Sequence, residues 1–130
     1  MKPKVLMVDD DPLVAMLYGR HLESAGYEML TARDGIEALA VASQALPQII
    51  MMDVMMAGMD GLSALRKLKQ TDATKAIPVV IITAHVSAHH ATRQEAQTAG
   101  AAGFLTKPFS PAQLLAEVAK YVPIGSARDS

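Results

Sequence analysis

Short runs of apolar residues recur along the chain and are separated by longer segments of mixed polarity. Residues 5–8, 49–52 and 79–82 each contain four apolar residues without polar alternation, and residues 104–106 form a shorter segment of the same kind. Such runs are typical of strands buried on both faces, as in parallel sheets covered by helices. Residues 28–32 predict one more short strand.

The segments between these strands have the apolar spacing of helices. Asp11 followed by Pro12 predicts an N-cap and a first-turn proline, and Gly26 predicts the end of this first helix. Each later helix is also expected to begin at a polar cap. These four helices are predicted to run from Asp34 to about Ala45, from Asp60 to near Gln70, from Ser87 to Gly100 and from Ser110 to Pro123.

Strands and helices therefore alternate five times. This order predicts the α/β class, with a doubly wound five-stranded parallel sheet, (βα)5, and right-handed crossovers. A length of 130 residues predicts one domain, over residues 1–123. Residues 124–130 are expected to form a flexible C-terminal tail.

The composition excludes several classes of protein. The absence of cysteine rules out disulfides, thiolate catalysis and cysteine-based zinc sites. The net charge of −1 argues against direct nucleic-acid binding, because a non-specific binder carries a basic excess. No apolar run approaches the ~18 residues of a membrane span, so we expect a soluble, cytoplasmic protein with no membrane partner. The nine methionines are interpreted as core filler rather than as copper ligands.

Polar residues follow the apolar runs directly. Asp9 and Asp10 come after the first run, Asp53 after the run at 49–52, Thr83 after the next, and Lys107 after the last. Because the carboxyl ends of parallel strands share one edge of a sheet, these side chains should meet in one crevice, where open α/β folds bind their ligands. Such a set can hold a divalent cation and, beside it, a phosphoryl group.

Three of these residues are acids, and their crowding requires an explanation. Two like charges ~4 Å apart repel by roughly 4 kcal/mol at an effective dielectric near 20. Mg²⁺ removes this conflict, because it prefers oxygen ligands and keeps several waters when one or two carboxylates hold it. The alternative is a solvated loop that caps the first helix. Capping needs only Asp11, which leaves Asp9 and Asp10 unexplained.

The other candidates also have structural alternatives. Thr83 could be a helix-capping hydroxyl, although a serine further along serves that purpose better. Lys107 could be a solvated lysine, but a lysine before proline at a strand end has no packing reason to be there. Phe104 could equally be an ordinary core residue. His85 and His89 have i, i+4 spacing, but no acid is nearby and His85 precedes the predicted helix, so zinc is disfavoured.

Together these motifs resemble the receiver domains of bacterial two-component response regulators, including the single-domain chemotaxis type. The resemblance covers residues 4–122 and rests on motifs at four strand ends. They are Asp9-Asp10, Asp53 with the residues that follow it to Gly61, Thr83-Ala84, and Lys107-Pro108-Phe109. Each motif alone is weak, but their order along the chain makes the match specific. The family's strand order is 2-1-3-4-5, which places the first and third strands side by side.

The resemblance implies a phosphoacceptor and a metal site. Asp53 would attack a phosphohistidine or a small phosphodonor as a carboxylate nucleophile. Asp10 and Asp53 would bind Mg²⁺ directly, together with the backbone carbonyl of Met55, and Asp9 would act mostly through water.

The resemblance also implies phosphoryl-binding and switch residues. Lys107 would pair with the phosphoryl oxygens, Thr83 would donate a hydrogen bond to them, and Ala84 would belong to the same binding set. Thr83 and Phe104 would act as the switch, because the family carries at the position of Phe104 an aromatic residue that changes rotamer on activation. The Lys107-Pro108 peptide bond is expected to be cis.

Function follows from the family. The phosphodonor partner would be a sensor histidine kinase or a histidine phosphotransfer protein. The phosphorylated chain would report to a downstream protein through its fourth helix, fifth strand and fifth helix. This is a signalling switch rather than an enzyme, with self-catalysed phosphorylation and dephosphorylation only. Small residues at 100–103 predict a monomer without phosphate.

Two alternatives use the same residues. A phosphohydrolase with an aspartyl-phosphate intermediate would carry an acid two residues after Asp53, where this chain has Met55. A receiver-like module that accepts no phosphate would have lost an acid, the threonine or the lysine, and none is lost here. The chain departs from the family pattern at Ala57, where proline is usual. Met55 and His85 occupy variable positions that influence how water reaches the acyl phosphate.

Overall fold

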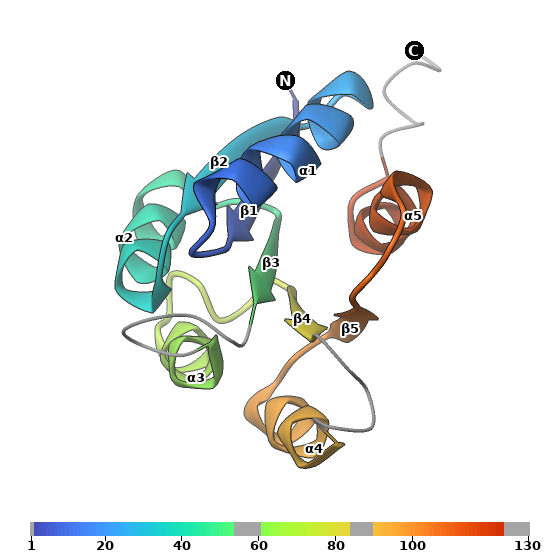
Figure 1. The fold of residues 1–130 in the computed structure, drawn as a ribbon. Coiled ribbons are helices and arrows are strands. Elements are labelled where there is room, and N and C mark those ends of the chain that lie inside the picture. The colour runs from blue at the N-terminus through green and yellow to red at the C-terminus, as the bar shows by residue number, and fades with distance from the viewer. Residues whose placement is uncertain (1, 54–60, 84–89, 124–130) are drawn as a thin grey trace.

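The structure is a computed structural model, and it describes residues 2–53, 61–83 and 90–123. Within these ranges strands and helices alternate strictly (Figure 1). The strands are β1 (Lys4–Val8), β2 (Glu28–Ala32), β3 (Ile49–Asp53), β4 (Val79–Thr83) and β5 (Gly103–Thr106). The helices are α1 (Pro12–Ser24), α2 (Gly35–Ala45), α3 (Gly61–Gln70), α4 (His90–Ala99) and α5 (Pro111–Tyr121). The predicted caps Asp60 and Ser87 and the predicted tail at 124–130 lie outside the described residues.

All strands of the sheet are parallel, and their order is β2-β1-β3-β4-β5. The predicted fold class and strand order are therefore confirmed. The register aligns Val8 with Met52 and Thr83 with Thr106. The carboxyl ends of β1, β3, β4 and β5 consequently lie along one edge of the sheet, as the candidate site requires.

Helices cover both faces of this sheet, which explains why the strand sequences lack polar alternation. Along β1, Leu6 and Val8 pack in a core cluster with side chains of α2, α3 and α4, whereas Val5 and Met7 pack with side chains of α1 and α5. Figure 1 shows the same division, with α1 and α5 on one face. Every residue of β3 is buried, and burying one large aliphatic side chain fully stabilises the fold by about 2 kcal/mol.

Two helix starts show how local sequence sets the boundaries. The Asp11 carboxylate accepts hydrogen bonds from the backbone N–H groups of Leu13 (3.0 Å) and Val14 (3.4 Å), so its role as the cap of α1 is confirmed. At α2, Asp34 accepts from the Glu37 N–H at 2.8 Å. The Glu37 carboxylate reaches back to a residue one position before the cap, in a variant of the predicted capping box.

No helix in the described ranges is both long and apolar enough to cross a membrane.

Candidate functional site

Asp9 is placed at the sheet edge by the end of β1. Its backbone N–H donates to the Ala32 carbonyl at 3.1 Å, which extends the pairing with β2 by one residue. Its Oδ1 atom accepts a hydrogen bond from the Asp11 N–H at 2.9 Å. Asp9 is only 3% exposed, whereas the neighbouring Asp10 is exposed. The two acids that the sequence presents as a pair therefore occupy different environments.

Asp53 and Lys107 meet across the same edge. Asp53 is the last residue of β3 and is buried. Lys107 follows β5, and its Nζ atom donates to Asp53 Oδ2 at 2.8 Å. Since β4 lies between β3 and β5, the lysine side chain reaches past one strand to make this contact. The Lys107-Pro108 peptide bond is cis, as predicted.

The charges at this edge act on one another. Burial is the largest influence on the pKa of Asp9 and raises it, and the charges of Asp53 and Asp10 raise it further. The hydrogen bond from the Asp11 N–H and the charge of Lys107 lower this pKa but do not cancel the rise. Burial alone would lower the pKa of Lys107. The hydrogen bond to Asp53 and the charges of Asp53 and Asp9 outweigh burial and raise it. Lys107 is therefore a stable cation beside two carboxylates.

One buried oxygen at the site lacks a hydrogen-bond partner. Asp9 Oδ2 accepts no hydrogen bond from the described residues, and the amine of Lys107 lies 3.9 Å away, outside hydrogen-bond range. An orphaned buried carboxylate oxygen costs about 1–3 kcal/mol, so a missing partner is expected. In the described ranges no three His, Cys, Asp or Glu side chains cluster as a metal site. Mg²⁺ needs only one or two protein carboxylates, because it keeps its waters, and the oxygen atoms present fit that ion.

The remaining predicted residues are only partly placed. Thr83 ends β4 opposite Thr106, so its backbone lies at the site edge between Asp53 and Lys107. Phe104 in β5 is half-buried and packs against the core cluster beneath α2, α3 and α4. Met55 and Ala84 lie outside the described residues, as do the departures at Ala57 and His85.

Sequence reasoning missed one residue beside this site. Tyr18 lies in the first predicted helix, and the sequence assigns it no role at the site. In the structure its ring stacks on Phe109, two residues after Lys107, with ring centroids 4.9 Å apart. Phe109 belongs to the motif that suggested the family, but the spacing of α1 contains no signal for this long-range contact.

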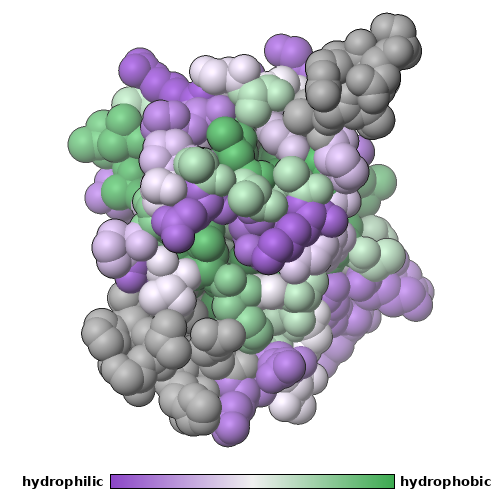
Figure 2. Space-filling model, turned by 90° about the vertical axis from the view of Figure 1, so that its right-hand side faces the viewer, coloured by the Kyte–Doolittle hydropathy of each residue, from purple (hydrophilic) through white to green (hydrophobic). Residues whose placement is uncertain are grey.

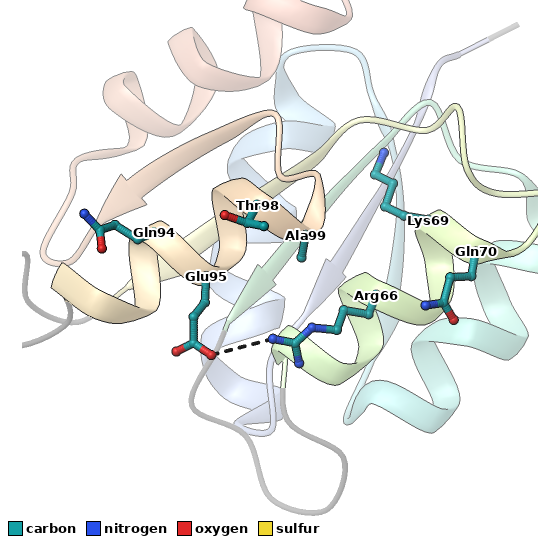
Figure 3. Close-up of a pocket in the computed structure, with 7 residues that line it drawn as sticks. All are labelled: Arg66, Lys69, Gln70, Gln94, Glu95, Thr98 and Ala99. Atoms are coloured by element: carbon teal, nitrogen blue, oxygen red, sulfur yellow. Dashed lines mark ion pairs between the residues drawn. The ribbon is translucent and has the colours of Figure 1, made fainter.

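The described residues line a groove at the site and a second groove away from it. One, of about 360 Å³, lies between α1 and β2 and includes Asp9 in its lining. The larger, of about 690 Å³, lies between α3 and α4, away from the acids (Figure 3). There Arg66 of α3 and Glu95 of α4 reach toward each other, 3.6 Å apart, while Lys69 points away (Figure 3). Lys69 donates instead to the carbonyls of Lys75 and Ile77, so the larger groove offers no free set of cations from these side chains.

The fold and the site together define a class: doubly wound α/β proteins with acids and a lysine at the carboxyl edge of the sheet. The family model for the response regulator receiver domain matches residues 5–119. The chain therefore belongs to the response regulator receiver domain family, the signalling domains of two-component systems.

Individual relatives agree with this assignment. Response regulator PleD of Caulobacter vibrioides is 44% identical over 118 residues, which are 91% of this chain and 26% of that protein. The transcriptional regulator RpaA of Synechocystis is 37% identical over 89% of this chain and 47% of its own length. The chain thus spans between a quarter and half of these two curated relatives.

Solved structures show the same fold. The Vibrio cholerae chemotaxis protein CheY4 superposes with a TM-score of 0.87 at 35% identity, covering 94% of this chain and all of that one (100%). The receiver domain of the sensor histidine kinase PA1611 from Pseudomonas aeruginosa has a TM-score of 0.84 at 27% identity, covering 93% of this chain and 98% of that one. The PA1611 structure is described as having a magnesium ion coordinated in the active-site cleft.

Proposed function

We propose that Asp53 accepts a phosphoryl group from a phosphohistidine or a small phosphodonor. A carboxylate oxygen of Asp53 forms a bond to phosphorus while the bond from phosphorus to the donor breaks, and its electron pair leaves with the donor. The observation that carries this proposal is the 2.8 Å contact between Lys107 Nζ and Asp53 Oδ2. A cation held there is in place to pair with the phosphoryl oxygens as they arrive on Asp53.

Mg²⁺ is the proposed cofactor. Asp9, Asp10 and Asp53, with the backbone carbonyl of Met55, would hold it. When bound, Mg²⁺ would neutralise the crowded acids and stabilise the charge that develops on the phosphoryl oxygens. The buried Oδ2 of Asp9 supports this assignment, because it accepts no hydrogen bond from the described residues.

The other site residues receive roles that rest on the family resemblance. Thr83 would donate its hydroxyl proton to a phosphoryl oxygen, and Ala84 would form part of the same binding surface. Phe104 would change rotamer with Thr83 when Asp53 is phosphorylated. The half-buried position of Phe104 against the core cluster is compatible with two packed arrangements of its ring. Such a pair of arrangements would carry the state of Asp53 to the surface.

The partners follow from these roles. A sensor histidine kinase or a histidine phosphotransfer protein would supply the phosphoryl group, and a downstream protein would bind the face made by α4, β5 and α5. Seen from the side on which α5 lies, the surface has a strip of apolar side chains between polar ones (Figure 2). The domain would span residues 1–123, with 124–130 as a tail, and would act in the cytoplasm as a switch with only self-catalysed phosphoryl transfer and hydrolysis.

Acetyl phosphate and beryllofluoride, a phosphoryl mimic, test this proposal. The wild-type chain should gain one phosphoryl group by intact-mass measurement and bind beryllofluoride, both only with Mg²⁺ present. Asp53→Asn should do neither. Asp72→Asn is the matched control, because Asp72 is a fully exposed acid whose side chain is 94% accessible. Equal phosphoryl uptake by Asp53→Asn and wild type would refute the assignment.

A further inference from the structure

The turn that carries Lys107 is held by an aromatic contact to α1. The rings of Tyr18 and Phe109 stack with centroids 4.9 Å apart and an interplanar angle of 29°. Both side chains are half-buried and pack against the core cluster beneath α1 and α5. Phe109 lies two residues after Lys107, so the stack fixes the chain immediately beyond the lysine.

The same turn is fixed at both of its ends. Before Lys107, Thr106 is paired in register with Thr83 of β4. After Phe109, Ser110 and Gln113 form a reciprocal capping box that starts α5, with bonds of 2.8 and 3.1 Å. Between these anchors, Lys107 itself pairs with Asp53, and the stack of Phe109 on Tyr18 ties the turn to α1.

Tyr18 also lies within electrostatic reach of the site residues. Burial raises the pKa of its phenol, and the charges of Lys107, Asp9 and Asp53 all act on it. Lys107 itself is one-third exposed, with its side chain 32% accessible, and carries a long flexible arm. Its amine therefore depends on a fixed backbone to stay at Asp53, and a small displacement of a charged group at a reacting centre has a large effect on rate.

We propose that Tyr18 is a positioning residue for phosphoryl transfer: its stack on Phe109 holds the turn so that Lys107 Nζ stays at Asp53. The inference rests on the proposed role of Asp53. It differs from a merely structural packing role, because it predicts that the effect of Tyr18 passes through Lys107. It also differs from a direct role of the phenol, because the ring is required and the hydroxyl is not.

Three substitutions separate these roles. Tyr18→Phe keeps the ring and should be phosphorylated by acetyl phosphate at the wild-type rate with saturating Mg²⁺. Tyr18→Leu removes the stack and should lower that rate about fivefold, within the range expected for an aromatic pair. In a Lys107→Ala background, Tyr18→Leu should cause no further loss. Tyr121→Leu is the control, since Tyr121 is a half-buried tyrosine whose hydroxyl bonds to Ala102, away from the acids.

The affinity for Mg²⁺, measured by calorimetry in each variant, provides the second readout. Tyr18→Leu should bind Mg²⁺ as wild type does, because carboxylates and not the lysine hold it. If Tyr18→Leu lost Mg²⁺ affinity as well as phosphorylation rate, the substitution would have damaged the whole site, and the inference would be overturned. A full fivefold loss that persists in the Lys107→Ala background, or an equal loss in Tyr18→Phe, would also overturn it. If wild type takes up no phosphoryl group, the proposed function fails; if wild type does and Tyr18→Leu matches it, only this inference fails.

Discussion

Lys107 bonds to Asp53 across an intervening strand, with Nζ 2.8 Å from Oδ2. The contact joins the last of the three site acids to a lysine 54 residues further along the chain. It also makes Lys107 a shared counter-ion, because Asp9 Oδ2 lies 3.9 Å from the same amine. The site therefore holds two buried carboxylates around one ammonium group.

Removal of that ammonium should destabilise the fold at neutral pH. We expect Lys107→Met to lower the free energy of unfolding by about 2 kcal/mol at pH 7, because two buried acids then face each other without a cation. The pKa of Asp9 is raised already and would rise further without Lys107, so the loss should shrink as acidification protonates that acid. Urea titrations from pH 7 to pH 4 measure this dependence.

The control for that experiment is Lys75→Met. Lys75 pairs with Asp72 at 3.2 Å, but both side chains are exposed, so the change should stay within about 0.5 kcal/mol. A Lys107→Met variant as stable as wild type at pH 7 would mean that the amine does not relieve the repulsion between the acids.

Asp9→Asn should stabilise the protein without Mg²⁺. The pKa of Asp9 is raised in the folded state, so its protonated form favours folding, and this contribution is lost as pH rises through the folded pKa. At pH 7 the neutral amide should therefore raise the melting temperature by a few degrees, and the gain should vanish below the ordinary pKa of 3.8.

Added Mg²⁺ should make the wild-type protein more stable than Asp9→Asn. At ten times its Kd, Mg²⁺ should stabilise wild type by about 1.4 kcal/mol and Asp9→Asn by much less. Thermal melts with and without the ion measure both effects. The same Mg²⁺-induced shift in both proteins would remove Asp9 from the proposed metal site.

A hydrogen bond far from the site anchors the C-terminal helix. The Tyr27 hydroxyl donates to the Val122 carbonyl at 2.6 Å, and Tyr27 is only 1% exposed. Tyr27→Phe should cost about 1–2 kcal/mol, because it leaves the Val122 carbonyl without this bond. Tyr121→Phe removes the exposed bond to Ala102 and should cost less than about 0.5 kcal/mol. If urea denaturation gave the same loss of unfolding free energy for both variants, the predicted dependence on burial would be wrong.

The unphosphorylated protein should be a monomer at micromolar concentration. At the start of β5, a Cβ atom added to Gly103 would lie 2.5 Å from the Tyr121 hydroxyl oxygen and 2.9 Å from Glu117 Oε2. These α5 side chains therefore leave no room for a side chain at position 103, and the small residues at 100–103 are the basis of the monomer prediction. Multi-angle light scattering should give the mass of one chain, and a stable dimer would contradict the prediction.

The sequence predicts what depends on neighbouring residues or on strand ends. Asp11 caps α1 as its position indicates, and the run at 49–52 is buried because helices cover both faces of β3. The parallel topology then brings Asp53 and Lys107 to one edge without further information.

Contacts between distant segments are harder to predict. Asp9 and Asp10 look equivalent in sequence, but only Asp9 turns inward, because its N–H pairs with β2 and its carboxylate with Asp11. The Tyr18–Phe109 stack depends on how α1 and the turn after β5 pack, which no local pattern encodes.

β5 is an edge strand, and this position links the site to backbone fluctuations. β5 pairs with β4 alone in the described sheet, and all its residues are half-buried. Edge strands open more readily than central ones, which exposes their amides to hydrogen exchange. Opening of β5 would withdraw Lys107 from Asp53 and leave both acids on the central strands β1 and β3. The rate of hydrogen exchange at the β5 amides therefore reports how often Lys107 leaves Asp53 and Asp9. A phosphoryl group on Asp53 that binds Lys107 should slow this exchange.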